Sequence, residues 1–358
     1  MADLFRSTMK KSEILPRVGD ISQLCSTKKL VYTEGIRSGV QVIEVKTGSG
    51  LVFTVLPSRG LDISHATFNG LSLSWISATG ETSPYFYQPE EYEWLRSFFG
   101  GLLTTCGMSY SMHPCEDNGE RLGLHGRVSN LPAEDVTIDK KWKGDDYFIS
   151  ISGNVRESKV FGDKLILNRT IETSLGAKSL KIIDRVENAG YLESPLMMLY
   201  HVNIGWPVVS EYSRLVIPSA QTLPFDDNAR SEPDQWSTFL PPQKDYKERV
   251  YLHDLKTTQN GIVNVSLVND EKEIGVYLRY SKEEFPYFIE WKMMGQGEYV
   301  VGIEPGNVNG NRARMREEGT LEFIKPGAER KFSLEIGILY GKNEIEKFIG
   351  GIQGETTR

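Results

Sequence analysis

The chain contains 358 residues, of which 41 are Lys or Arg and 48 are Asp or Glu, so its formal charge at neutral pH is −7. Nucleic acid is therefore a poor candidate partner, because contacts to phosphate backbones need a basic surface. Hydrophobic residues make up 39% and charged residues 25% of the chain, which argues against the disordered and fibrous classes. The length fits either two ordinary domains or one large β-domain.

The start of the chain and the cysteines bear on its location. Residues 1–20 lack the apolar run that a signal peptide carries before its cleavage site. No later stretch approaches the ~20 apolar residues that a bilayer requires. The cysteines Cys25, Cys106 and Cys115 match no zinc-binding spacing and cannot all pair within the chain. We expect a cytoplasmic protein with no membrane partner.

Apolar and polar residues alternate with a period of two along most of the chain, which predicts strands. In chain order the clearest runs are 51–56, 71–75, 165–172, 180–186, 196–200, 263–267, 274–280, 299–303 and 332–338. The runs 165–172 and 180–186 are expected to be antiparallel neighbours. Asn269-Asp270 has the residue types of a turn between 263–267 and 274–280.

Helical periodicity is scarce. A short helix that opens with proline is predicted over Pro89–Phe98, and a final helix carrying Ile345, Phe348 and Ile349 is predicted to be capped by Asn343. No linker, low-complexity segment or internal repeat is evident. The sequence predicts one all-β domain over 1–358, a large antiparallel β-sandwich with a few short accessory helices, in which 1–36 is a lead-in segment.

Two of the five histidines have unusual neighbours. His125 lies in LGLHGR, where the flanking glycines permit close backbone approach to a ligand. His201 ends the apolar run 196–200, so its ring should point into a pocket mouth or into the core. Taken singly, either residue is more readily explained as a hydrogen-bonded core imidazole.

Glu304 and Arg59 are the charged candidates. Glu304 follows the apolar run 299–303 and precedes a Pro-Gly pair, so we expect it at the end of a sheet, where it is either a fixed base or a solvated carboxylate. Arg59 follows the run 51–56 and either holds a ligand or ties Asp62 or a loop carbonyl. No HExxH zinc site, no GxSxG elbow and no phosphate loop occurs, so no metal site is expected.

Six motifs occur in order between Arg37 and Tyr340: PSRGLDIS, FFGGLLTTCG, LGLHGR, LYHVN, EWKM and GIEPGN. Together they resemble the galactose-mutarotase-like superfamily, the aldose 1-epimerases, and most closely an epimerase-like branch that is poorly characterised. The resemblance implies a β-supersandwich with its site in a cleft on the concave face of one sheet. It implies a small-molecule sugar as partner and no cofactor, and a homodimer stays open.

The resemblance also assigns roles to residues. Glu304 would be the base, His201 the acid, and His125 a hydrogen-bonding group that fixes the sugar. Arg59 matches the arginine that grips the substrate. The acidic residue that holds a sugar hydroxyl is matched by Glu248, with Asp226 and Asp227 as rivals.

Further substrate contacts are expected from Asn203, Lys292 and Trp206, whereas Trp75 is expected to pack in the core. The surroundings of His201, Tyr-His-Val-Asn, depart from the family's Asn-His-Pro-Tyr. This departure leaves the identity of the sugar open.

The expected function is an isomerase of the aldose 1-epimerase type, which interconverts the anomers of a monosaccharide or modified monosaccharide. Ring opening needs a base for the anomeric hydroxyl and an acid for the ring oxygen, which we expect on opposite sides of the sugar. Two alternatives remain: an epimerase or isomerase acting at another carbon, and a carbohydrate-binding or regulatory protein without turnover.

Overall fold

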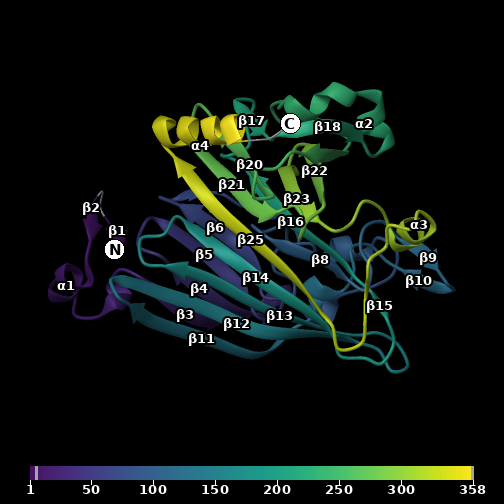
Figure 1. The fold of residues 1–358 in the computed structure, drawn as a ribbon, viewed down its shortest axis with the longest axis horizontal. Helices are drawn as coiled ribbons and strands as arrows, with labels where there is room; N and C mark the ends of the chain where they lie inside the picture. The colour runs from purple at the N-terminus through teal and green to yellow at the C-terminus, as the bar shows by residue number, and fades with distance from the viewer. Residues whose placement is uncertain (5–6, 356–358) are drawn as a thin grey trace.

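The computed structural model describes residues 1–4 and 7–355, and strands make up most of its body (Figure 1). The largest sheet has the strand order β11-β12-β13-β14-β25-β21-β20-β17, and all of its neighbours are antiparallel. In that order the strands are Ala133–Lys143, Asp146–Ser158, Lys164–Ser174, Ser179–Asn188, Glu329–Tyr340, Ile274–Ser281, Ile262–Asn269 and Ser213–Val216.

A second sheet has six strands in the order β18-β19-β22-β23-β16-β8. These strands are Ser219–Pro224, Arg249–Leu255, Tyr287–Met294, Tyr299–Gly306, Met197–Gly205 and Thr104–Met108. A third sheet, β3 to β7, consists of Ser26–Val31, Gln41–Lys46, Leu51–Leu56, Asp62–Phe68 and Leu71–Ser72.

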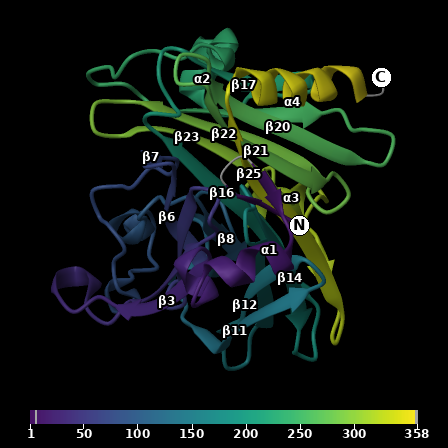
Figure 2. The same cartoon turned by 90° about the vertical axis from the view of Figure 1, so that its left-hand side faces the viewer.

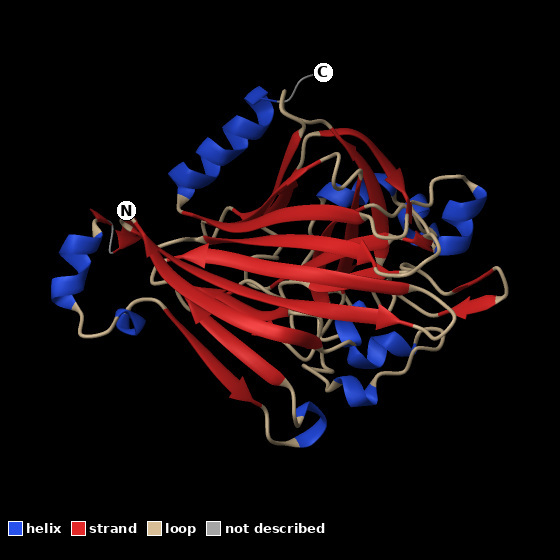
Figure 3. Ribbon diagram, turned by 60° about the horizontal axis from the view of Figure 1, so that its bottom comes forward, coloured by secondary structure: helices blue, strands red, loops and turns tan. Residues whose placement is uncertain are grey.

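The remaining elements are short ribbons and helices. The two-stranded ribbons pair β1 with β2, β9 with β10 and β15 with β24, at Ala2–Leu4, Ser7–Met9, Cys115–Asp117, Glu120–Leu122, Ser194–Pro195 and Phe323–Ile324. The α-helices α1 to α4 are Lys11–Ile14, Asp227–Ser231, Arg312–Glu317 and Lys342–Glu355. Figure 3 shows the helices at the periphery of the strands, and α4 lies across β20 and β21 (Figure 2).

Within the six-stranded sheet, β8, β16 and β23 are buried on both faces, whereas β18 at the sheet edge is not. Along β16, Met198, Tyr200 and Val202 point into the main core, which they share with apolar residues of the other two sheets. Met197 and Leu199 point the other way into a second apolar cluster with Trp94. Because side chains alternate along a strand, residues of odd number on β16 face this second cluster.

The second cluster is built by segments outside the large sheets. Segment 92–98, residues 110–124 and α3 cover the outer face of the six-stranded sheet through Trp94, Phe98, Tyr110, Met112, Leu122, Leu124 and Met315. The cavity described below lies in this layer.

The predicted fold class, a large antiparallel β-sandwich with few helices, is confirmed. The two predicted neighbour relationships are also confirmed, since β13 pairs with β14 and β20 pairs with β21. The single domain over 1–358 stays a prediction. Within the segment 1–36, β3 pairs with β4, and Leu4, Ile14 and Cys25 belong to the main core.

Several local predictions were wrong. The helix over Pro89–Phe98 is only a 3-10 helix at Glu93–Ser97, since Glu91 has a φ of +45° that interrupts a helix before it. Asn343 is the second residue of α4 and not its cap. The run 71–75 pairs as a strand only at Leu71–Ser72 and continues as an isolated bridge at Ser74.

Candidate active site

A cavity of about 120 Å³ lies against the outer face of the six-stranded sheet. This volume is roughly ten times the 10–15 Å³ that one water molecule needs. It is lined by Tyr92, Trp94, Leu95, Phe98, Met112, His113, Leu124, His125, His201, Glu248, Val250, Ile289, Trp291 and Glu304. The three residues predicted to be catalytic therefore meet at one cavity, although they are far apart in sequence.

His201 and Glu304 are brought together by strand register. They occupy facing positions on β16 and β23, between the pairs Leu199–Gly306 and Val202–Ile303. The ladder is interrupted there, where Pro305 has no N–H to contribute. His201 Nε2 lies 3.2 Å from Glu304 Oε1, and both side chains are almost fully buried.

These positions correct two expectations. Both residues lie inside strands of the sheet and not at strand or sheet ends. The imidazole and the carboxylate lie side by side, so no guest can fit between them. They can instead face the two oxygens of a hemiacetal, which are neighbours because both are bonded to one carbon.

Gly302 makes room for this pair. A Cβ at position 302 would lie 2.2 Å from Glu304 Oε1 and 3.1 Å from His201 Cε1. Real Cβ contacts are never this short, so any side chain at this position must displace the carboxylate. The observed position of the Glu304 carboxylate thus depends on the absence of a side chain at Gly302.

His125 comes from a tight loop outside the sheet. Its φ is +57°, a conformation that costs free energy for a non-glycine residue and is often found at functional sites. The loop is held because the His125 N–H donates to the Met112 carbonyl at 2.9 Å and the Gly107 N–H donates to the His125 carbonyl at 2.8 Å. Its ring centroid lies 5.8 Å from that of His201, at nearly right angles.

Aromatic rings enclose the two imidazoles. The rings of Phe98 and Trp291 each lie 5.3 Å from the ring of His201, and Trp94 lies 4.9 Å from His125. These rings exclude water and present apolar faces, which suit the C–H face of a sugar.

Burial shifts the pKa values of His125, His201 and Glu304 in the direction that favours the neutral form of each side chain. It raises the pKa of Glu304 well above its usual 4.5, and the negative charge of Glu248 adds to this effect. It lowers the pKa of His201 to about 3, although the Asn203 side chain acts in the opposite direction. The pKa of His125 is well below 6.5, chiefly through burial and then through the other histidines.

Several buried polar atoms of the cavity residues have no hydrogen-bond partner. They are Trp94 Nε1, His125 Nδ1, His201 Nδ1 and Glu304 Oε1, and the 3.2 Å contact of the last with His201 Nε2 does not have hydrogen-bond geometry. Buried polar groups are rarely left unpaired, and four such atoms belong to residues that line this one cavity. The unpaired atoms therefore point to a polar ligand in this cavity.

Arg59 does not reach the cavity. It is fully buried, and its three guanidinium nitrogens donate to the carbonyls of Ser129, Thr82 and Ser97 at 2.5 to 2.8 Å. Burial lowers its pKa to about 10. Arg59 thus ties the loop after His125 to the segment that carries Trp94 and Phe98, which is the structural alternative left open by its sequence.

Lys292 and Asn203 also lie outside the cavity lining. Lys292 points to the reverse face of β22, where its Nζ donates to the carbonyls of Gln235, Trp236 and Thr238. Asn203 is buried on β16 beside His201, and its Nδ2 donates to the carbonyls of His201 and Gly101 at 2.9 and 3.1 Å. Asn203 therefore helps to hold β16 in position, its Oδ1 has no hydrogen-bond partner, and its contact with a substrate stays a prediction.

Of the three acidic rivals, Glu248 lines the cavity. Its Oε2 accepts the Nε1–H of Trp291 at 2.8 Å. Asp226 caps α2 through the Ala229 N–H, and the exposed Asp227 pairs with Arg230. Glu248 is the acidic residue in reach of a guest.

The two remaining tryptophans differ from each other. Trp206 is 67% exposed and is not among the cavity residues, so its expected stacking role finds no support. Trp75 does not line the cavity; it is half-buried and packs against Phe98 and Trp291 of the second cluster.

Tyr92, Trp94, Phe98, His113 and Trp291 line the cavity but were not predicted as site residues. For Trp291 a signal was available in the EWKM motif. Alternation along β22 places Ile289 and Trp291 on one face and Lys292 on the other, so Lys292 and Trp291 cannot both face the site.

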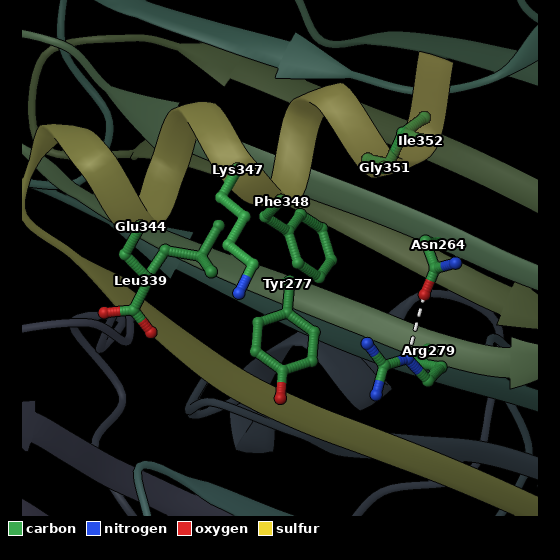
Figure 4. Close-up of a pocket in the computed structure, with 9 residues that line it drawn as sticks. All are labelled: Asn264, Tyr277, Arg279, Leu339, Glu344, Lys347, Phe348, Gly351 and Ile352. Atoms are coloured by element: carbon green, nitrogen blue, oxygen red, sulfur yellow. Dashed lines mark hydrogen bonds between the residues drawn. The ribbon is translucent and has the colours of Figure 1, made fainter. Parts of the chain in front are cut away.

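A second cavity, of about 370 Å³, lies between α4 and the eight-stranded sheet (Figure 4). Phe348 packs against Tyr277 with 4.8 Å between ring centroids, and Arg279 donates to Asn264 Oδ1 at 2.9 Å. It is larger than the first cavity, but no histidine lines it.

Within residues 1–4 and 7–355, no group of three or more His, Cys, Asp or Glu side chains is arranged to hold a metal ion. Within the same residues, no helix combines the length and apolar character needed to cross a membrane.

Comparison with solved structures places the fold. A candidate aldose 1-epimerase from Klebsiella pneumoniae superimposes with a TM-score of 0.89 at 24% identity, over 98% of this chain and 91% of that one. A galactose mutarotase-like protein from Clostridium acetobutylicum gives 0.61 at 16% identity, over 89% and 99%. A galactose 1-epimerase from Lactobacillus acidophilus gives 0.58 at 11%, over 89% and 100%. Such identities establish a shared fold and not a shared reaction.

Sequence comparison is narrower. No protein of curated function matches the chain. A family model described as "Domain of unknown function (DUF4432)" matches residues 37–338, nearly the range over which the six motifs occur. The chain therefore belongs to the DUF4432 family, and it has the galactose mutarotase-like fold that its motifs predicted.

Proposed function

We propose that this protein is an isomerase that interconverts the α and β anomers of a monosaccharide by opening and closing its ring. The observation that supports this most is the meeting of His201, Glu304 and His125 at one cavity, with buried polar atoms that lack partners. General acid–base catalysis needs such groups within about 3 Å of the atoms that exchange protons.

The reaction balances with one proton shared by the pair. The base removes the proton of the anomeric hydroxyl while the acid protonates the ring oxygen, so the bond from the anomeric carbon to the ring oxygen breaks and a carbonyl forms. Rotation about the adjacent carbon–carbon bond presents the other face of the aldehyde. Closure reverses both transfers and returns each group to its starting state.

Burial favours the neutral pair, in which Glu304 carries the proton and His201 is an uncharged imidazole. In the second form the proton lies on His201. Glu304 is then a carboxylate that can act as the base, and His201 is an imidazolium that can act as the acid, as we assign them. Both forms hold the same number of protons, so a guest whose hydroxyl donates to the carboxylate shifts the balance to the second form. Activity should decline at high pH when the pair loses its proton and at low pH when it gains another.

The other residues bind and orient the sugar. His125 is neutral because of its low pKa, so one ring nitrogen donates and the other accepts a hydrogen bond. Glu248, at the edge of the cavity, is suited to accept a hydroxyl proton. Trp291 and Phe98 provide the surfaces on which the ring stacks.

The test is exchange spectroscopy by NMR across a panel of free sugars, with the wild type, Glu304→Gln and the control Glu172→Gln. Glu172 is exposed on β13, in a different sheet. We expect the wild type and the control to accelerate anomer exchange for at least one sugar and Glu304→Gln to lose most of that acceleration. No acceleration with any sugar, or full activity in Glu304→Gln, would contradict the proposal.

The same experiment in deuterated water separates the related reactions. Ring opening leaves every carbon-bound hydrogen in place, whereas epimerisation through proton abstraction at another carbon introduces deuterium there. Deuterium bound to a carbon of the product would favour epimerisation at that carbon over ring opening.

A sugar-binding protein without turnover is the other candidate. The burial of Glu304 is the observation that favours it, because burial raises the pKa of this residue and so disfavours the carboxylate form that a base needs. Calorimetry that shows binding of a sugar whose anomers do not exchange faster would establish this role instead.

A further inference from the structure

Resting on the proposed function, we propose that the substrate is an uncharged deoxy sugar, an aldose in which hydrogen replaces at least one hydroxyl. The inference follows from the side chains that surround the space beside His201 and Glu304. It names the substrate class of that same site.

The first step concerns charge. None of the described residues that line the cavity is Arg or Lys, whereas two of them, Glu304 and Glu248, are acidic. Arg59 and Lys292 were the basic residues expected at the site. Both donate their hydrogen bonds to backbone carbonyls outside the cavity. A phosphate, sulfonate or carboxylate on the sugar would lose its hydration without gaining a cationic partner.

The second step concerns hydroxyl groups. More than half of the lining is apolar: Trp94, Leu95, Phe98, Met112, Leu124, Val250, Ile289 and Trp291. The proton-transfer groups, His201 and Glu304, are committed to the anomeric and ring oxygens. The polar groups that then remain for the other hydroxyls of an aldose are outnumbered by the apolar side chains; they are Tyr92, His113, His125, Trp94 Nε1 and Glu248.

Val250, Ile289, Leu95, Leu124 and Met112 form the aliphatic wall of the cavity. A sugar hydroxyl against this wall would lose its hydrogen bonds to water without finding a partner, whereas burial of a methyl or methylene group there is favourable. Val250 and Ile289, on the neighbouring strands β19 and β22, belong to this wall. The volume of about 120 Å³ also favours a small guest.

The experiment compares sugars that differ by one group. The anomer exchange rates of D-glucose, D-galactose and D-ribose are measured beside 2-deoxy-D-glucose, D-fucose and 2-deoxy-D-ribose, and beside D-glucose 6-phosphate and D-glucuronate. We expect one deoxy sugar to exceed its parent about 5- to 100-fold in kcat/KM. The two anions should fall at least about 100-fold below the best neutral sugar.

Binding provides a second, independent readout. Quenching of tryptophan fluorescence in Glu304→Gln, where Trp94 and Trp291 line the cavity, ranks the same sugars by Kd without turnover. If no sugar exchanges but deoxy sugars bind best, the proposed function fails and the ligand class holds. If an anionic sugar ranks first, or no deoxy sugar exceeds its parent, the ligand class is wrong even where ring opening is observed.

A variant tests the wall itself. Val250→Thr keeps the side-chain shape and adds a hydroxyl beside the guest, so the ratio of deoxy to parent sugar should fall severalfold. The control Val52→Thr makes the same change at a half-buried position of β5 in the five-stranded sheet and should leave the ratio unchanged. An unchanged ratio in Val250→Thr would contradict the role of the wall.

Discussion

The six-stranded sheet carries two histidine–glutamate pairs with the same separation, one on each face. His201 Nε2 lies 3.2 Å from Glu304 Oε1 on the outer face, and His253 Nε2 lies 3.2 Å from Glu290 Oε2 on the inner face. Both pairs join neighbouring strands, and both are almost fully buried. The distance alone therefore does not distinguish a catalytic pair from a structural one.

The difference lies in what surrounds each pair. His253 uses both ring nitrogens, since its Nδ1 also contacts Thr222 Oγ1 at 2.9 Å, and it packs against Trp236. The Nδ1 of His201 has no partner, and its ring lines a cavity. An imidazole whose two nitrogens are engaged stabilises the fold, whereas one with a free nitrogen beside a cavity is available to a ligand.

Substitution of the two glutamates should separate the pairs most strongly. Glu304→Gln keeps the shape but cannot take up a proton, so we expect the rate of anomer exchange to fall about 100- to 10,000-fold while the protein stays folded. Glu290→Gln should keep the exchange rate within a few-fold and lower the free energy of unfolding by about 1–3 kcal/mol. Kinetics and chemical denaturation of both variants measure this; equal losses of activity would remove the distinction.

Gly302→Ala sharpens the comparison through geometry. The new Cβ would displace the Glu304 carboxylate, and a shift of about 1 Å at a catalytic group can cost about 100-fold in rate. Gly350→Ala is the control, because nothing lies within 4 Å of its Cβ position in α4, and it should leave the rate unchanged. A fully active Gly302→Ala would show that the observed position of the carboxylate is not required.

Glu248→Gln tests the effect of the acidic charge beside the outer pair. The Glu248 charge raises the pKa of Glu304, so its removal should lower that pKa and move the alkaline limb of the pH–rate profile, where the pair loses its proton, to lower pH, with a rate change below about tenfold. Asp227→Asn removes an exposed charge that does not line the cavity and should not move the limb. A shift of the limb to higher pH in Glu248→Gln would contradict this assignment.

The smallest expected effect is on stability. Because the pKa of Glu304 is higher in the folded than in the unfolded protein, the folded state binds more protons and its stability falls as pH rises above about 4.5. Glu304→Gln lacks this loss, so its melting temperature relative to wild type should increase with pH over that range. A constant difference between the two would show that Glu304 does not titrate with a raised pKa.

The fold was largely predictable because its signal is local. Alternation located strands in all three large sheets, and the Asn269-Asp270 turn and the spacing around Gly176 joined the right neighbours, but about half of the strands of these sheets, including the long β11 and β12, were not predicted. Which sheet each strand entered depends on contacts between distant residues, which periodicity does not report. Glu304 was misplaced for this reason, since its Pro-Gly sequence is typical of a sheet end but lies inside β23.

The site was predictable only in part. The motifs identified His125, His201 and Glu304, but the partners of Arg59 are carbonyls of three segments that are distant in sequence, which no sequence pattern specifies. Lys292 is different, because alternation along β22 already puts it on the face opposite Trp291. Applying the period-two alternation to the EWKM motif would have excluded Lys292 as a residue of the same site as Trp291.

The central claim, that His201 and Glu304 act as one proton-sharing unit, is tested most directly by a double-mutant cycle. Anomer exchange rates are measured by NMR for wild type, His201→Asn, Glu304→Gln and the double variant, with the best sugar of the panel. Residues that act as a unit are non-additive, so the double variant should lose about as much as either single one. Losses that multiply in the double variant would contradict the account.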